Sequence, residues 1–97
     1  MALARVVSFD GVSADRMAEM RRDMQEEEQP EGLNATELIV LHDPDSERSL
    51  VILFFENEDD YRTADRTLNA MSPDETPGSR ASVGKYQVAV RMTSATA

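Results

Sequence analysis

The spacing of apolar residues predicts four strands and two helices. Apolar positions two residues apart, or in short unbroken runs, indicate strands, and positions three or four apart indicate helices. In chain order these elements run β-α-β-β-α-β. The predicted strands are Leu3–Phe9, Thr36–His42, Ser49–Glu56 and Ser82–Met92, and the predicted helices run from Ala14 to about Glu28 and from Glu58 to about Met71.

Polar residues mark the helix starts and one tight turn. Ser13 and Asn57 stand just before the two helices, where a side-chain oxygen can accept a free backbone N–H of the first turn. Acids at 58–60 suit the positive end of the second helix. Asp43-Pro44 opens a polar turn between the second and third strands, which therefore form a hairpin.

This order predicts an α+β fold of the ferredoxin-like βαββαβ type. Short connections between the elements give a four-stranded antiparallel sheet with both helices on one face. At 97 residues the chain is long enough for one domain, and we assign all of 1–97 to it.

The two middle strands are apolar on both faces, which predicts a partner. In the third strand Leu50, Ile52 and Phe54 face one way and their neighbours Val51, Leu53 and Phe55 face the other. Two helices cover one face of the sheet, and a soluble monomer rarely leaves the other face apolar and bare. We therefore expect a homodimer with two sheets packed face to face about a two-fold axis, a dimeric α+β barrel.

Composition narrows the partners and the chemistry. Nineteen Asp and Glu against ten Lys and Arg give a net charge of −9, which disfavours nucleic acid and anionic membranes as partners. The chain has no Cys, so disulfides, thiol catalysis and thiolate metal sites are excluded. No apolar run approaches the length of a membrane span, and the expected location is cytoplasmic.

The element order, the doubly apolar third strand and the junction Phe54-Phe55-Glu56-Asn57-Glu58-Asp59-Asp60-Tyr61 resemble the dimeric α+β barrel superfamily, and within it the antibiotic biosynthesis monooxygenase-like domains. The resemblance covers about residues 3–92. It implies a small-molecule cavity in each subunit between sheet and helices, and in some members oxidation of aromatic compounds without metal or flavin. Haem degradation is not expected, because no His lies in or after the second helix.

Several residues are candidates for a site in such a cavity. His42, Tyr61 and Tyr86 could act on a substrate as acid, base or hydrogen-bonding groups. Met17, Met20 and Phe55 could line the apolar pocket that holds it. Each also has a purely structural interpretation: His42 would bond to the turn at its strand end, the methionines would pack the core, and the tyrosine hydroxyls would reach water.

Two functions follow as hypotheses. The first is a small-molecule-binding dimeric α+β barrel protein that acts as a cofactor-independent monooxygenase on an apolar aromatic compound, by holding and desolvating a substrate that itself reacts with oxygen. The second is a non-catalytic ligand-binding, sensor or accessory protein. Neither requires a cofactor or a metal, and the acidic turn at 43–48 lacks the Gly and Glu that a calcium loop needs.

Overall fold

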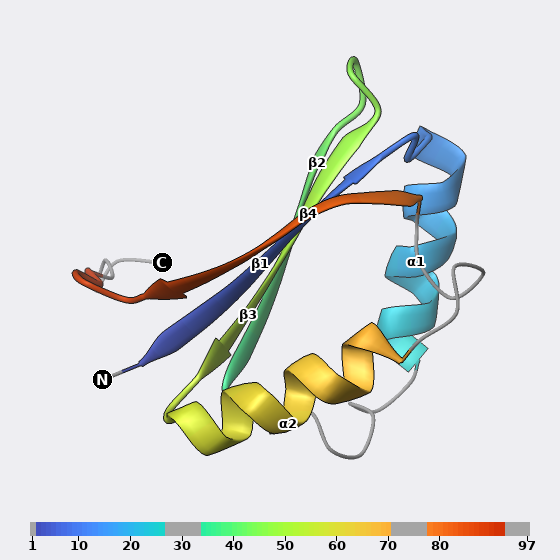
Figure 1. Ribbon diagram of the computed structural model, residues 1–97. Coiled ribbons are helices and arrows are strands. Elements are labelled where there is room, and N and C mark those ends of the chain that lie inside the picture. The colour runs from blue at the N-terminus through green and yellow to red at the C-terminus, as the bar shows by residue number, and fades with distance from the viewer. Residues whose placement is uncertain (1, 27–33, 71–77, 93–97) are drawn as a thin grey trace.

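The computed structural model describes residues 2–26, 34–70 and 78–92. Its elements follow the predicted order, and the four strands form one antiparallel sheet in the order β2-β3-β1-β4 (Figure 1). The elements are β1 (Leu3–Asp10), α1 (Ala14–Glu26), β2 (Glu37–Asp43), β3 (Arg48–Phe55), α2 (Glu58–Asn69) and β4 (Ser79–Gln87).

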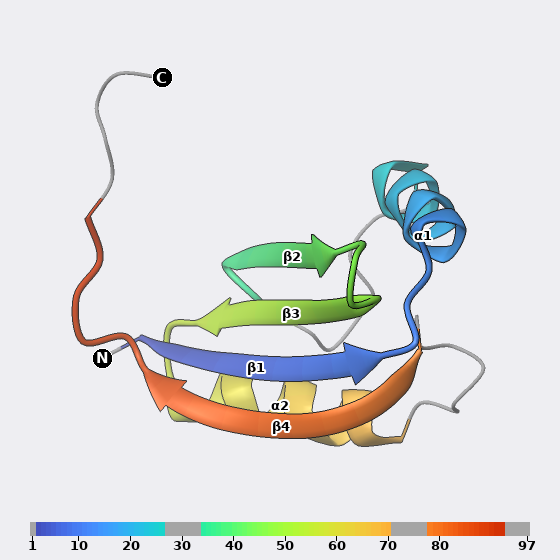
Figure 2. The same cartoon turned by 90° about the horizontal axis from the view of Figure 1, so that it is seen from above.

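The architecture is the predicted ferredoxin-like α+β fold. β1 and β3 are the central strands, and β2 and β4 form the edges. Both helices lie on the same side of the sheet (Figure 1), and Figure 2 looks onto the opposite side. The sheet therefore has one face toward the helices and one face that they leave uncovered.

The core lies between the sheet and the helices in two clusters. Phe55 has no exposed surface and packs with Leu3 and Leu53 against Tyr61 and Ala64 of α2. Fully burying such a side chain stabilises a fold by about 1.5–3 kcal/mol. The second cluster lies nearer the β2–β3 turn and consists of Val7, Phe9, Val12 and Met17, with Met20, Val40 and Val51 packed against it.

Both predicted helix caps are present. The Asp60 backbone N–H donates to Asn57 Oδ1 at 2.8 Å, and the Arg16 N–H donates to Ser13 Oγ at 3.1 Å. Three acidic residues occupy the first turn of α2, where the helix dipole favours them. The last methionines that we assigned to the apolar stripes, the side chain of Met24 and the whole of Met71, lie outside the described residues.

Hydrogen bonds from Arg5 and Arg80 to Asp65 and Asn69, which we call the polar seam, also attach α2 to the sheet. Arg5 of β1 is only 3% exposed, and its guanidinium donates to Asp65 Oδ1 at 2.9 Å and to Asn69 Oδ1 at 3.1 Å. Arg80 of β4 donates to the same Asn69 oxygen at 2.9 Å. Because a buried guanidinium without partners is strongly destabilising, this seam restricts where α2 can lie on the sheet.

The bounds of β4 differ from the prediction. We expected Ser82–Met92, whereas β4 begins at Ser79 and ends at Gln87. It ends there because β1, its neighbour among the described strands, begins at Leu3, the partner of Gln87, and one further hydrogen bond joins the Val88 N–H to the Ala2 carbonyl. It begins early because a register shift near Phe9 lets Arg80 and Ser79 pair with the end of β1.

We expect Phe55→Ala to lower the free energy of unfolding by about 3–5 kcal/mol, because it empties a fully buried site. Leu38→Ala is the control, since Leu38 also faces the helix side but is largely exposed at the edge strand, and we expect it to cost under about 1 kcal/mol. Urea unfolding followed by circular dichroism measures both. Equal losses in the two variants would contradict the assigned core.

Candidate functional site

The face of the sheet opposite the helices is apolar across its β2–β3 half. The register places alternate residues of each strand on this face. Leu41 remains 49% exposed there, and Leu50 is also exposed. We call this surface the open face. Its large apolar residues are Ile39 and Leu41 of β2 and Leu50, Ile52 and Phe54 of β3, with Val6 of the neighbouring β1.

The β1–β4 half of the open face carries small side chains. Ser8 and Ser82 lie opposite each other with their hydroxyl oxygens 2.7 Å apart. Gly84 lies two residues after Ser82 on the same face. A Cβ built at Gly84 would lie 2.6 Å from the ring of Tyr86, so the ring can lie against the strand only because residue 84 is glycine. Tyr86 itself is 59% exposed. We call the β2–β3 side of the open face the bulky half and the β1–β4 side the low half. The low half is low at Ser8 and Ser82 and is raised by the Tyr86 ring over Gly84.

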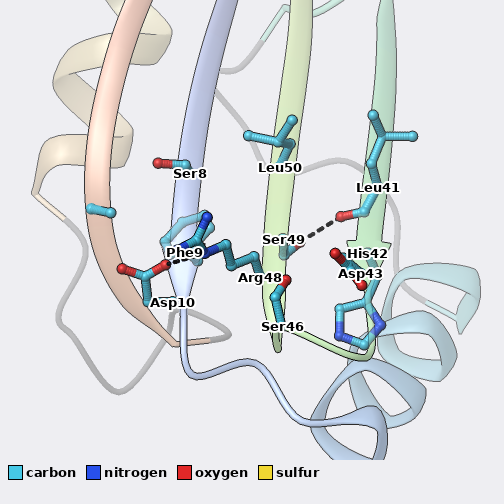
Figure 3. A pocket seen from close by; sticks show the side chains of 11 residues that line it. Ser8, Phe9, Asp10, Leu41, His42, Asp43, Ser46, Arg48, Ser49 and Leu50 are labelled. Carbon is cyan, nitrogen blue, oxygen red and sulfur yellow. Dashed lines mark hydrogen bonds and ion pairs between the residues drawn. The ribbon is translucent and has the colours of Figure 1, made fainter.

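An open cleft of about 660 Å³ lies at the end of the open face nearest the β2–β3 turn. Figure 3 shows apolar Leu41 and Leu50 above it, with charged and hydroxyl side chains around its lower end. Its lining comes from β1, β2 and β3, from the β2–β3 turn and, through Ala81, from β4. The lining residues are Ser8, Phe9, Asp10, Leu41, His42, Asp43, Ser46, Arg48, Ser49, Leu50 and Ala81.

The cleft contains two carboxylates and one guanidinium. Arg48 pairs with Asp10 at 3.6 Å across the β1–β3 boundary. Asp43 lies on the β2 side, and hydrogen bonds from the Ser46 hydroxyl and from the backbone N–H groups of Asp45 and Ser46 hold its pKa below its ordinary value of 3.8. Asp43 is therefore anionic throughout the physiological range.

Hydrogen bonds within the β2–β3 hairpin fix the turn beside the cleft. The Asp45 N–H donates to Asp43 Oδ1 at 3.1 Å, as expected for a turn that starts with Asp. The buried hydroxyl of Ser49 donates to the Leu41 carbonyl at 2.9 Å across the hairpin (Figure 3). These bonds hold the Asp43 side of the cleft in place without a ligand.

His42 reaches the cleft from the helix side of β2. Its Nε2 lies 2.9 Å from the carbonyl oxygen of Val12, so Nε2–H is the donor. The bond connects β2 to the segment between β1 and α1. His42 thus has a structural hydrogen bond, but its partner is Val12 and not the turn at its own strand end that we expected; it also contributes to the cleft wall.

Tyr61 and Phe55 form an edge-to-face pair under α2, with ring centroids 5.6 Å apart. The Lys85 ammonium lies 5.0 Å from the Tyr61 ring and pairs with Glu58, whose pKa it lowers. Burial, and after it the charge of Asp65, raises the pKa of the Tyr61 hydroxyl above 10.0. Tyr61 is therefore neutral at physiological pH.

The structure brings only some of the predicted site residues together. Phe55 and Tyr61 are in contact at one end of the helix side, while His42, Met17 and Met20 lie toward the other end, beside or within the second core cluster. Tyr86 belongs to the opposite face of the sheet. The three predicted catalytic side chains therefore do not converge on one point.

Sequence reasoning missed most of the cleft. We had placed the cavity between sheet and helices, and of our candidates only His42 lines the open-face cleft. The signal was nevertheless present in part, because Leu41 and Leu50 were already assigned to doubly apolar strands. The contribution of Ser8 and Asp10 depends on strand register, which has no local sequence signature.

The described residues contain neither a metal-binding cluster nor a membrane-spanning helix. Among residues 2–26, 34–70 and 78–92, no group of three or more His, Cys, Asp or Glu side chains is arranged to hold a metal ion. Neither described helix combines the length and apolar character that crossing a bilayer requires.

Tyr61 should titrate above its ordinary pKa. The chain has two tyrosines and no tryptophan, so Tyr86→Phe leaves Tyr61 as the only phenol. We expect its absorbance titration to have a midpoint above 10.0 in the folded protein and an ordinary midpoint in urea. Since folding raises this pKa, its contribution to stability is complete below pH 10 and is lost as the pH rises through the folded value. A folded midpoint at or below 10.0 would show that the hydroxyl is not desolvated.

Comparison with protein-family models, with curated proteins and with solved structures gives no match for this chain. The resemblance to the dimeric α+β barrels therefore rests on the element order, the doubly apolar β3 and the residues at the β3–α2 junction.

Proposed function

We propose that this protein is a homodimeric small-molecule-binding protein, assembled as a dimeric α+β barrel in which two open faces pack together. The observation that carries this proposal is the open face itself. Six large apolar side chains lie on it, and α2 packs against the other face, behind the sheet in Figure 2. Exposed apolar patches of this kind mark interaction surfaces.

The shape of the open face favours a second copy as its partner. A two-fold axis that runs parallel to the strands, between the two sheets, sets β2–β3 of one copy over β1–β4 of the other. The bulky half, at Leu41, then meets the low half at Ser82. An axis across the strands would set bulky on bulky and low on low. The first arrangement is self-complementary, as an isologous interface requires.

The cleft supports a binding role. Its size falls within the range of small-molecule sites, and it combines apolar Leu41 and Leu50 with a few polar groups, which is the usual composition of such sites. A catalytic role would need an acid or base with an orienting partner near one reacting atom. His42, Tyr61 and Tyr86 are separated, so binding without turnover is the better supported of the two hypotheses.

A cofactor-independent monooxygenase acting on an apolar aromatic compound is the second candidate. The observation that favours it is the presence of His42 in the wall of the cleft, where an imidazole could take a proton from a bound phenol-type substrate. Oxygen uptake with a panel of polycyclic phenols separates the candidates. Uptake that His42→Gln abolishes supports the oxygenase, and binding without uptake supports the carrier or sensor.

We expect Ile39→Asp to convert the protein from dimer to monomer, because it puts a charge among the apolar side chains of the open face, beside Ile52. Val83→Asp is the matched control, since Val83 is also on an edge region but faces the helix side. Sedimentation velocity should give a mass near 21.6 kDa for the parent and Val83→Asp, twice the 10.8 kDa chain, and 10.8 kDa for Ile39→Asp. Circular dichroism checks that both variants are folded. A folded Ile39→Asp dimer would refute the open-face interface.

A further inference from the structure

The cleft lies on the open face, which gives it an unusual position in the proposed dimer. Asp10, Leu41 and Leu50 all point away from the helices. The space on the helix side is occupied by packed side chains, including Phe55, which has no exposed surface. A second sheet laid on the open face would therefore form the missing wall of the cleft, and a ligand would lie between the two sheets.

The polar groups of the cleft favour a cation. Arg48 already faces Asp10. Asp43 is engaged by uncharged donors, the Ser46 hydroxyl and backbone N–H groups of its own turn. A carboxylate has about four acceptor positions, so Asp43 can accept a further hydrogen bond from an ammonium group. The net charge of −9 on the chain also attracts cations to the protein.

We propose that the cleft binds a primary amine with an apolar body, held between the two sheets of the dimer. The ammonium group donates to Asp43, and the apolar body lies on Leu41 and Leu50 under the open face of the partner copy. This inference rests on the proposed function, because the site is complete only when the second sheet covers it.

Ligand binding and assembly are then coupled. A ligand that contacts both sheets binds the dimer more tightly than the monomer, so by linkage it must also strengthen the dimer. The coupling is reciprocal: the amine lowers the dimer dissociation constant, and dimerisation raises the affinity for the amine by the same factor.

Three probes with one apolar body test the preference for a cation. They are 4-phenylbutylamine, 4-phenylbutanol and 4-phenylbutyrate, measured by isothermal titration calorimetry at pH 7 with the full chain. We expect the amine to bind about tenfold more tightly than the alcohol, as a charge-assisted hydrogen bond to Asp43 would give once the partner copy covers the cleft, and the carboxylate to bind most weakly. Tightest binding by the carboxylate, or equal binding of all three, would overturn the proposal.

A matched pair of variants tests the role of Asp43. Asp43→Asn keeps an acceptor for the Asp45 N–H and removes the charge, and we expect it to reduce amine affinity about tenfold, to that of the alcohol. Asp45→Asn removes the same charge two residues away, outside the cleft lining, and should leave amine affinity within about twofold. Equal losses would indicate a general effect of charge and would overturn the assignment.

The dimer dependence is tested separately. The amine should lower the dimer dissociation constant of the parent chain, and the folded Ile39→Asp monomer should bind the amine at least about tenfold more weakly, although Ile39 does not line the cleft. A chain that is monomeric throughout would defeat the proposed function. A dimer that shows no amine preference, or whose monomer binds the amine equally well, would defeat this inference alone.

Discussion

Every apolar strand face needs a covering layer, and β3 has two such faces while the described helices cover one. The buried side is filled by Leu53 and Phe55 under α2. The other side carries Leu50, Ile52 and Phe54, and of these Phe54 lies beside the start of β2 with the Arg91 guanidinium 5.2 Å from its ring centroid. Removing apolar surface from water is worth about 25 cal/mol for each Å², so an uncovered face of this kind strongly favours association. The proposed dimer is the simplest way to cover the open face, since it needs only a second copy of the same chain.

The position of α2 depends on matching two kinds of contact at once. Tyr61 and Ala64 supply the apolar contact, and Asp65 and Asn69 receive the buried guanidinium of Arg5. A hydrophobic contact alone would permit α2 to slide, whereas fixed hydrogen-bond geometry does not. α2 is therefore held along β1 and β4, and the opposite face of those strands stays free for the low half of the open face.

Local signals account for the parts of the fold that sequence reasoning predicted. Asn57 and Ser13 were identifiable as caps because capping involves residues within one helical turn. The doubly apolar pattern of β3 was equally local. The ends of β4 were predicted wrongly, since they depend on where β1 begins, more than 80 positions away in the chain. The Val88 N–H still donates to the Ala2 carbonyl, but Val90 and Met92 lie beyond β4, so their spacing alone does not make a strand.

The residues of the candidate site were harder to predict, because they too are brought together by contacts between distant parts of the chain. Its lining joins β1, the β2–β3 turn and Ala81 of β4, and these meet only through strand register and the shift near Phe9. His42 was found because histidine is rare and chemically distinctive in this chain. The sequence contains 29 charged residues, and nothing in it distinguishes Asp10, Asp43 and Arg48 from the others as cleft residues. Only the fold shows that these three line the cleft.

The central claim is that the open face is an interface between two copies. Native mass spectrometry of the unmodified chain, purified without added ligand and diluted through the micromolar range, tests it most directly. The account predicts a species of 21.6 kDa that gives way to 10.8 kDa only on dilution. A 10.8 kDa species at every concentration would contradict it, and would leave the second apolar face of β3 without a function.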